Sequence, residues 1–244
     1  MNEARAVLPP LEYPGRLLSI GSSPSGKEFV IVYAITGRSP SSQARCLVHE
    51  GGGVWVRPTD EDVLKQGQVD LLVYPSLLFG ASGLAVSNGK QTSDIRNGLD
   101  KAEDPVAVLS RALRSWDFEP DAPIFTPRIS GCVAGGRAAL SVIRRSPEGE
   151  TLRSFFEVPL RPGQGRFVST YPGPNEDPLP CFEGEPRRLS MPATGPRETA
   201  ELVYAALGPR PGGRDFRVAV ACVFASVADP AAVDVHIINR HERT

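Results

Sequence analysis

The chain has 244 residues and a formal net charge of −1 at pH 7, so it can bury a core without a metal or a disulfide and has no overall field to attract nucleic acid or an anionic membrane. Hydrophobic residues make up 41% of it, and no apolar run approaches the roughly 18 residues of a membrane span or follows a charged leader, so we expect a cytoplasmic protein. Glycine and proline, 24 of each, are scattered without a period and indicate many turns between strands.

Residues 1–12 form a loose lead-in without a pattern, and the apolar runs at 16–21 and 28–36 predict a hairpin. The second run is apolar almost without interruption, which predicts a strand buried on both faces. It leads into a loop, 37–45, with two arginines and three serines. Such a loop can grip an oxyanion or a phosphate, although a solvated hairpin loop is the plainer alternative. Further strands are predicted at 46–50, 53–57, 70–79 and 84–86.

Asn88 and Gly89 give a turn signal ahead of a short helix expected at about 94–99. This arrangement would bring Asn88, Lys90 and Thr92 near a helix N-terminus, which is a natural anion site. A simple capped turn would show the same pattern.

The clearest helix signal covers Asp104–Trp116, with Asp104 as N-cap and Pro105 in the first turn. A second such helix is predicted at 196–207. The remaining strands are predicted at 129–133, 138–145, 152–159, 166–171, 217–225 and 233–239, with a long ordered loop at 173–192. Two antiparallel groups of strands with few helices predict an α+β protein, most simply a four-layer α-β-β-α sandwich.

The segment 118–131 carries an acid, Glu119, and a guanidinium, Arg128, on either side of three prolines, ahead of a predicted buried strand. Proline restricts the residue before it, so Glu119 and Thr126 are expected in extended conformations. A stiff, extended loop is a good mount for side chains that must hold position. A surface connection with two solvated charges is the alternative.

Several kinds of chemistry are excluded by missing motifs. The sequence has no phosphate-binding P-loop, no dinucleotide fingerprint and no zinc-protease motif. Its three histidines lack metal-ligand spacing, and its four cysteines lie far apart, so we expect buried free thiols, no metal site and no cofactor. If the protein is an enzyme, its general acids and bases would then be carboxylates, tyrosine, lysine or cysteine, assisted by arginine.

Six short motifs occur along the chain. They are Tyr13-Pro14-Gly15-Arg16 with Ile20-Gly21, Gly37-Arg38-Ser39, Val86-Ser87-Asn88-Gly89 with Thr92 and Asp94, Asp117-Phe118-Glu119, Thr126-Pro127-Arg128-Ile129 and Ser169-Thr170-Tyr171. In their order and spacing they resemble the archaeal-type inosine monophosphate (IMP) cyclohydrolases and their bacterial homologues. The resemblance covers roughly residues 13–240, and each motif alone is weak, whereas six in register are fairly specific.

The resemblance implies a single domain over 1–244 with the N-terminal-nucleophile hydrolase fold, a homo-oligomer, and a purine ribonucleotide as the bound partner. It also implies a reaction in which formamido-imidazole-carboxamide ribotide loses water and closes to IMP. Donors and one carboxylate suffice for such a ring closure. By their match to the family, the expected catalytic residues are Arg38, Tyr74 and Glu119, and the expected substrate-binding residues are Ser39, Arg45, Asn88, Thr126 and Arg128, with Arg128 favoured for phosphate and Arg16 as a further candidate.

Other functions stay open from the sequence. One is a cyclase or amide hydrolase acting on a related nucleotide, and another is a nucleotide-binding protein without turnover. The loop after Arg38 and the length of the 173–192 segment differ from the family pattern, which leaves the substrate less defined than the reaction class. The start of the chain, Met1-Asn2, offers no terminal nucleophile, and this counts against the amide hydrolase.

Overall fold

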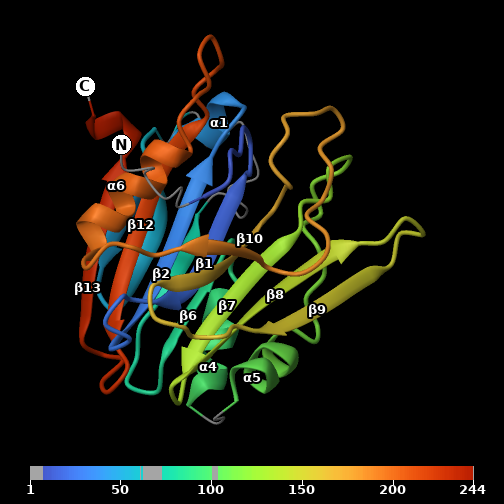
Figure 1. Cartoon of the computed structure of the whole chain (residues 1–244). Helices are drawn as coiled ribbons and strands as arrows, with labels where there is room; N and C mark the ends of the chain where they lie inside the picture. The colour runs from blue at the N-terminus through green and yellow to red at the C-terminus, as the bar shows by residue number, and fades with distance from the viewer. Residues whose placement is uncertain (1–7, 61, 63–72, 101–103, 244) are drawn as a thin grey trace.

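The computed structural model describes residues 8–60, 62, 73–100 and 104–243. Residues 1–7 of the expected lead-in and residues 70–72 of the expected strand at 70–79 lie outside the described part. Within it, two antiparallel sheets pack together and carry few helices (Figure 1), as the sequence pattern predicted. None of the described helices is long and apolar enough to cross a membrane.

The first sheet has six strands in the order β11-β10-β1-β2-β12-β13. Its middle strand β2 is buried along nearly its whole length, which confirms the expectation from its continuous apolar run. The strands are β1 (Arg16–Ser22), β2 (Glu28–Thr36), β10 (Gln164–Ser169), β11 (Arg187–Ser190), β12 (Arg217–Ser226) and β13 (Val233–Asn239).

The second sheet is a seven-stranded meander in the order β3-β4-β5-β6-β7-β8-β9. Each strand pairs with the next one along the chain, so register follows from short connections. The strands are β3 (Arg45–Glu50), β4 (Gly53–Pro58), β5 (Tyr74–Leu78), β6 (Leu84–Ser87), β7 (Arg128–Ala134), β8 (Arg137–Arg145) and β9 (Thr151–Glu157).

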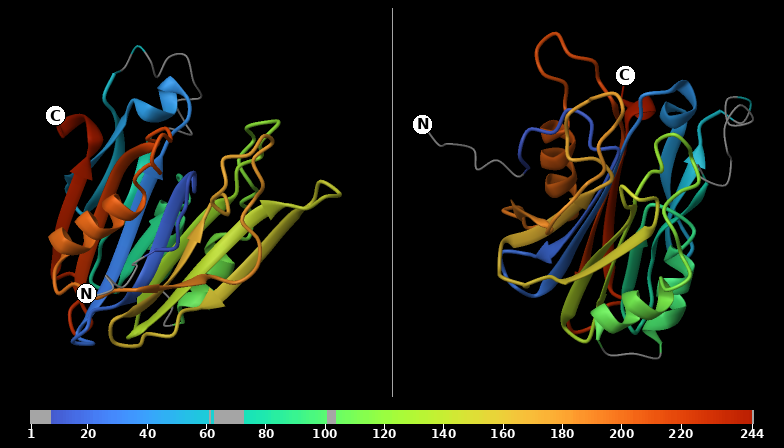
Figure 2. Two further views of the ribbon diagram at one scale, coloured as in Figure 1. Left: turned by 45° about the horizontal axis from the view of Figure 1, so that its top comes forward. Right: turned by 90° about the vertical axis from the view of Figure 1, so that its right-hand side faces the viewer.

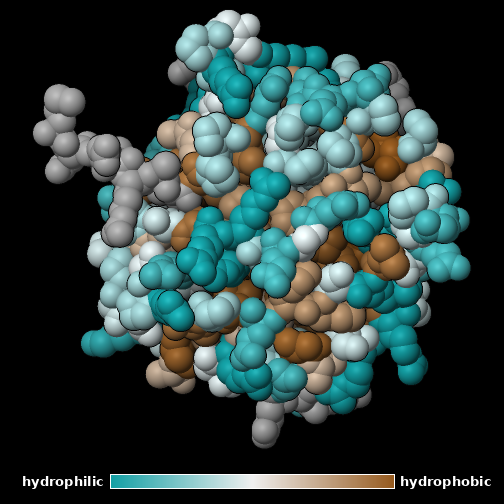
Figure 3. All heavy atoms as spheres, turned by 45° about the vertical axis from the view of Figure 1, so that its right-hand side comes forward, coloured by the Kyte–Doolittle hydropathy of each residue, from teal (hydrophilic) through white to brown (hydrophobic). Residues whose placement is uncertain are grey.

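The largest apolar core lies between the two sheets and takes side chains such as Ile31 from one and Val56 from the other. A second core joins the first sheet to α6 (Pro196–Ala206), and a third joins the second sheet to α4 (Thr92–Leu99) and α5 (Pro105–Ala112). The helices therefore cover opposite outer faces, as Figure 2 shows. The side on which β8, β9 and β10 lie shows brown apolar patches among teal hydrophilic ones (Figure 3).

The sequence-based boundaries were wrong in two places on the helices. Helix α5 begins at Pro105 with Asp104 as its cap, as expected, but it ends at Ala112 and not at Trp116. The guanidinium of Arg153 donates to the carbonyls of Leu113 (3.3 Å) and Trp116 (2.7 Å), so these groups are satisfied without a further helical turn. A short helix, α1 (Pro40–Gln43), also forms within the expected loop 37–45.

The segment 173–192 is not entirely a loop, because β11 lies within it. This strand pairs antiparallel with β10. Its sequence, Arg-Arg-Leu-Ser, has no alternating apolar pattern, so the pairing partner and not the local sequence determines the strand.

One end of the sandwich gathers most of the residues singled out by the sequence, at the top in Figure 1. Strands β2, β6 and β10 end there, and β1, β3, β5 and β7 begin there. The connection from α5 to β7 crosses the same end and carries Glu119, whose backbone N–H donates to the Thr126 carbonyl at 2.9 Å. Residues distant in sequence therefore meet at this end.

Candidate active site

Glu119 is the centre of a buried polar cluster at this end. Its side chain is 2% exposed and accepts from Arg16 Nη2 through both carboxylate oxygens, at 2.8 and 2.9 Å. Asn88 Nδ2 donates to its Oε1 at 3.4 Å, and Arg128 Nη1 lies 3.9 Å from the same oxygen. The structure thus brings together Glu119, Asn88 and Arg128, three of the residues expected to form the site, and places Arg16, the further candidate for the phosphate, against Glu119.

The carboxylate of Glu119 is more basic than an exposed one. Burial raises the pKa of Glu119, and the charges of Arg16 and Arg128 offset part of that rise. Although burial lowers the pKa of Arg16, the carboxylate of Glu119 raises it well above the usual range, so the guanidinium stays charged. A buried base beside fixed donors is an arrangement suited to proton transfer.

Arg128 is held by the protein on three sides. Its Nε donates to the Asp117 carbonyl at 2.8 Å, its Nη1 donates to Gln91 Oε1 at 3.2 Å, and its guanidinium lies over the Trp116 ring at 4.9 Å. These contacts orient the guanidinium towards Glu119. They leave fewer of its N–H donors for a phosphate than the sequence had suggested.

Two tyrosines form a buried pair at the start of β5. The hydroxyls of Tyr33 and Tyr74 lie 2.8 Å apart, and both side chains are at most 2% exposed. Burial raises the pKa of Tyr33 well above its usual range, so its hydroxyl keeps its proton. Tyr74 was predicted from the resemblance to the family, whereas Tyr33 was missed because a tyrosine in a continuous apolar run resembles any core residue.

Arg45, at the start of β3, is a buried cation with spare donors. It is 2% exposed, and its Nε donates to the Ser42 carbonyl at 2.9 Å. Its Nη1 is buried without a hydrogen-bond partner among the described residues. Burial lowers the pKa of Arg45, with the nearby Arg16 acting in the same direction. An unpaired buried guanidinium is costly, and such a cost is accepted where an anion binds.

Two predicted residues lie apart from the Glu119 cluster. Arg38 lies over the Tyr13 ring at 5.2 Å and donates to Asn175 Oδ1 at 3.2 Å. Ser39 is exposed, and its hydroxyl accepts from the Ser42 amide as the N-cap of α1. The side chain of Ser39 therefore serves the helix.

Thr126 is buried and hydrogen-bonded within the loop that carries Glu119. Its backbone N–H donates to Asp121 Oδ1 at 2.7 Å, and its hydroxyl bonds to Asp121 Oδ2 and to the Tyr171 hydroxyl, 2.9 Å away. These contacts fix the loop. Tyr171 comes from the Ser-Thr-Tyr motif, which the sequence had singled out only as a family marker.

A cavity of about 130 Å³ adjoins the cluster. It is lined by Asn88, Gly89, Lys90, Trp116, Glu119, Pro120 and Arg128. Thr92 lies at the N-terminus of α4, as predicted, although the helix begins at Thr92 and not at about residue 94. The hydroxyls of Ser87 and Thr92 are hydrogen-bonded to each other.

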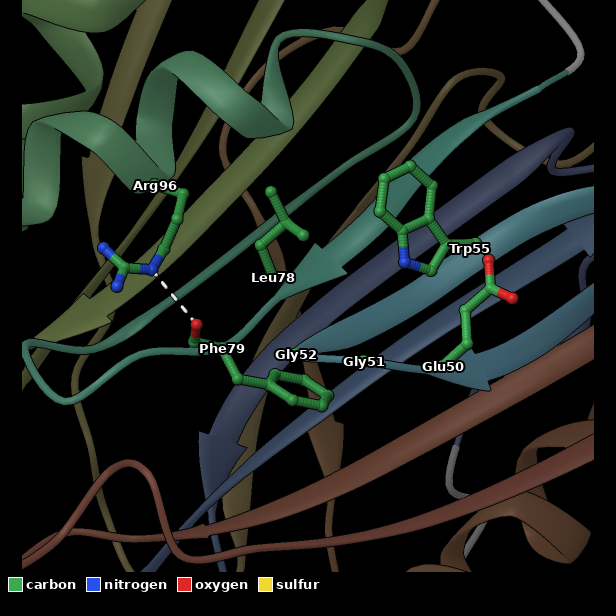
Figure 4. A pocket seen from close by; sticks show the side chains of 7 residues that line it. All are labelled: Glu50, Gly51, Gly52, Trp55, Leu78, Phe79 and Arg96. Carbon is green, nitrogen blue, oxygen red and sulfur yellow. Dashed lines mark hydrogen bonds between the residues drawn. The ribbon is translucent and has the colours of Figure 1, made fainter.

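A larger, open hollow of about 510 Å³ lies beside α4 on the outer face of β3, β4 and β5 (Figure 4). Its charged groups do not converge on it: Arg96 donates to the Phe79 carbonyl at 3.1 Å, and Glu50 pairs with Arg57. The chemistry-bearing groups gather at the Glu119 cluster, so we place the candidate site there and not in the larger hollow.

No group of histidine, cysteine, aspartate or glutamate that could hold a metal ion occurs among the described residues. The four cysteines are free thiols, and Cys46, Cys132 and Cys222 are buried, as predicted.

Two comparisons bear on this site. The chain matches the family model described as IMP cyclohydrolase-like protein over residues 13–226. It is also 28% identical over 169 residues to the IMP cyclohydrolase of Methanothrix thermoacetophila, an alignment that covers 68% of this chain and 78% of that relative.

Proposed function

The chain belongs to the family of IMP cyclohydrolase-like proteins, and from this we propose that the Glu119 cluster closes the second ring of IMP. In the reaction that the family resemblance implies, the carboxamide nitrogen of formamido-imidazole-carboxamide ribotide attacks the formyl carbon, and one water is lost. Nucleophile and electrophile belong to one molecule. The protein must therefore select the reactive rotamer, stabilise the oxyanion and move a proton.

Glu119 moves the proton in this proposal. Its carboxylate takes a proton from the carboxamide nitrogen as the new C–N bond forms and passes that proton to the formyl oxygen, which becomes a hydroxyl. Glu119, a carboxylate again, then takes the N–H proton of the former formamido nitrogen and passes it to the hydroxyl, which leaves as water as the C=N bond forms. The raised pKa of Glu119 supports this role, because a base closer to neutrality is better matched to both transfers.

The oxyanion is stabilised by the hydroxyl of Tyr74. Tyr33 is fully buried and its hydroxyl has one hydrogen-bond partner among the described residues, Tyr74. If Tyr33 donates to Tyr74, the proton of Tyr74 is free to point at the formyl oxygen. Arg38 assists only after its guanidinium turns from Asn175 towards the substrate.

Arg45 holds the phosphate in preference to Arg128. Arg45 is charged, buried and has a guanidinium nitrogen without a partner among the described residues, whereas Nε and Nη1 of Arg128 are engaged by Asp117 and Gln91. Guanidinium and phosphate match in geometry and charge. Asn88 and Thr126 border the base and ribose.

The observation that carries the proposal is the buried Glu119 carboxylate held by Arg16 at 2.8 and 2.9 Å. Purified protein should convert the formylated ribotide to IMP faster than the spontaneous reaction does. The absorbance of the purine product measures this conversion. Glu119→Gln should lower turnover by about 10²–10⁴-fold with little change in ribotide affinity. Normal turnover in that variant would remove Glu119 from the mechanism, and tight binding without turnover in the wild type would favour a nucleotide-binding protein.

For the whole protein, we propose that the chain forms one domain of the N-terminal-nucleophile hydrolase type and acts as a homo-oligomer in the cytoplasm. The continuous core between the sheets supports one domain, and four cysteines without a disulfide are typical of a reducing compartment.

A further inference from the structure

Gln91 is fully buried directly before α4, yet its side chain does not serve the helix. It occupies the N-cap position, where a side chain commonly accepts from the first turn, but makes no such bond. Its Oε1 instead accepts from Arg128 Nη1 at 3.2 Å, and its Nε2 donates to Asn88 Oδ1 at 3.2 Å and to Ser130 Oγ at 3.5 Å. Gln91 therefore bridges two residues that flank Glu119.

The bridge has a direction that follows from hydrogen-bond chemistry. A guanidinium can only donate, so the oxygen of the Gln91 amide must face Arg128 and its NH₂ group must face Asn88. Asn88 must then turn its oxygen towards Gln91, where the Ile129 amide also donates to it at 2.9 Å. The NH₂ group of Asn88 is left to donate to the Pro127 carbonyl at 2.9 Å and to face Glu119 Oε1, 3.4 Å away.

Gly89 leaves room for this bridge. A Cβ atom at Gly89 would lie 2.5 Å from Gln91 Oε1 and 2.7 Å from Arg128 Nη1. Both distances are too short for a real contact, so the Gln91–Arg128 bond occupies the place of a side chain.

We propose that Gln91 is a positioning residue, which holds the Arg128 guanidinium beside Glu119 without letting the two pair fully and, with the backbone of Ile129 and Pro127, keeps the NH₂ group of Asn88 on the side of Glu119. This role rests on the proposed function of Glu119 as the proton carrier. It accounts for the distance of 3.9 Å between Arg128 Nη1 and Glu119 Oε1, because the acceptor on Gln91 holds that nitrogen back.

Two substitutions at Gln91 should shift the pKa of Glu119 in opposite directions. Gln91→Glu keeps the shape but adds a negative charge and cannot donate to Asn88, so the carboxylate of Glu119 becomes harder to ionise. Gln91→Met removes the acceptor for Arg128, which can then close on Glu119 and make it easier to ionise. The other charged groups facing Glu119 are Arg16 on β1, Asp121 in its own loop and Lys90, which lines the same cavity, and neither substitution alters them.

The test is a carboxyl ¹³C NMR titration of Glu119 in protein labelled at glutamate, with the resonance assigned from Glu119→Gln. Gln91→Glu should raise the titration midpoint of Glu119 by about one pH unit, and Gln91→Met should lower it. Gln164→Glu adds the same charge at an exposed position on β10 and should leave the midpoint unchanged. Equal midpoints in wild type and both Gln91 variants, or shifts in the same direction, would overturn the proposal.

Kinetics give a second readout. The acid limb of kcat/KM for ring closure should move with the NMR midpoint, so the activity of Gln91→Glu should recover as the pH is raised. A loss that is equal at every pH would indicate a structural defect and overturn the proposal. Because the titration needs no substrate, an inactive wild type would contradict the proposed function and leave the positioning role to be judged by NMR alone.

Discussion

Replacing Arg45 with methionine should increase stability and weaken binding at the same time. Arg45 is 2% exposed, with one nitrogen buried and unpartnered among the described residues. An unsatisfied buried polar group costs about 1–3 kcal/mol, and the lost bond to the Ser42 carbonyl offsets part of this gain. Methionine retains the apolar stem, so Arg45→Met should raise the free energy of unfolding by between zero and about 2 kcal/mol.

Binding should change in the other direction. If Arg45 holds the phosphate, its loss removes a charge-assisted hydrogen bond worth about 1.5–3 kcal/mol, which is roughly a 10- to 140-fold increase in Kd or KM for the ribotide. The matching nucleoside, which lacks the phosphate, should bind wild type and variant equally. This comparison separates loss of the phosphate contact from a general distortion of the site.

Urea unfolding measures the first effect, and calorimetric titration with ribotide and nucleoside measures the second. A variant that is several kcal/mol less stable would show that the guanidinium of Arg45 is satisfied in the folded protein. Equal loss of affinity for ribotide and nucleoside would show that Arg45 shapes the pocket and does not read the phosphate. Either result would refute the reasoning.

Further predictions concern the other buried groups at this end of the sandwich. Burial raises the pKa of Glu119, so the folded state binds the carboxyl proton more tightly than the unfolded state does. The resulting stabilisation of the folded state is complete below pH about 4.3, the ordinary pKa of glutamate, and is lost as the pH rises through the pKa of Glu119 in the folded state. Unfolding free energies of wild type and Glu119→Gln measured across pH should therefore show the corresponding downward slope only in the wild type. Tyr33→Phe and Tyr74→Phe should each lower the free energy of unfolding by about 1–3 kcal/mol, because each change leaves the other buried hydroxyl without its partner. In urea unfolding the double variant should lose less than the sum of the two single losses. Additive losses would contradict the pairing. Gly89→Ala should separate Gln91 from its guanidinium partner and lower turnover, and a variant with wild-type kinetics would show that the loop relaxes at no cost.

The sequence predicted those parts of the fold that depend on local pattern. The continuous apolar run at 28–36 is the buried strand β2, and the Asp104-Pro105 pair begins α5. Elements fixed by distant partners were not predictable in the same way. The end of α5 depends on Arg153 from β9, and β11 depends on its pairing with β10.

The same distinction applies to the candidate site. Glu119 and Arg128 could be singled out because prolines and charges stand together in one short segment. The pairing of Arg16 with Glu119 joins residues 103 positions apart. Arg16 is the first residue of β1, and nothing in the local sequence indicates its partner. Gln91 gave no signal either, because a glutamine before a helix is ordinary until its burial and its partners are known.

The balance of charge at this end of the sandwich favours an anionic ligand, as the proposed function requires. The guanidiniums of Arg16 and Arg128 lie near one buried carboxylate, Glu119, and a third guanidinium, that of Arg45, lies near Arg16. The carboxylate compensates Arg16 at hydrogen-bond distance and Arg128 only at 3.9 Å, which leaves positive charge that burial makes unfavourable. A phosphate carries up to two negative charges, so a ribotide would neutralise this excess while its base remains beside Glu119. Binding energy from the phosphate end can then fix the reactive rotamer at the other end of the substrate.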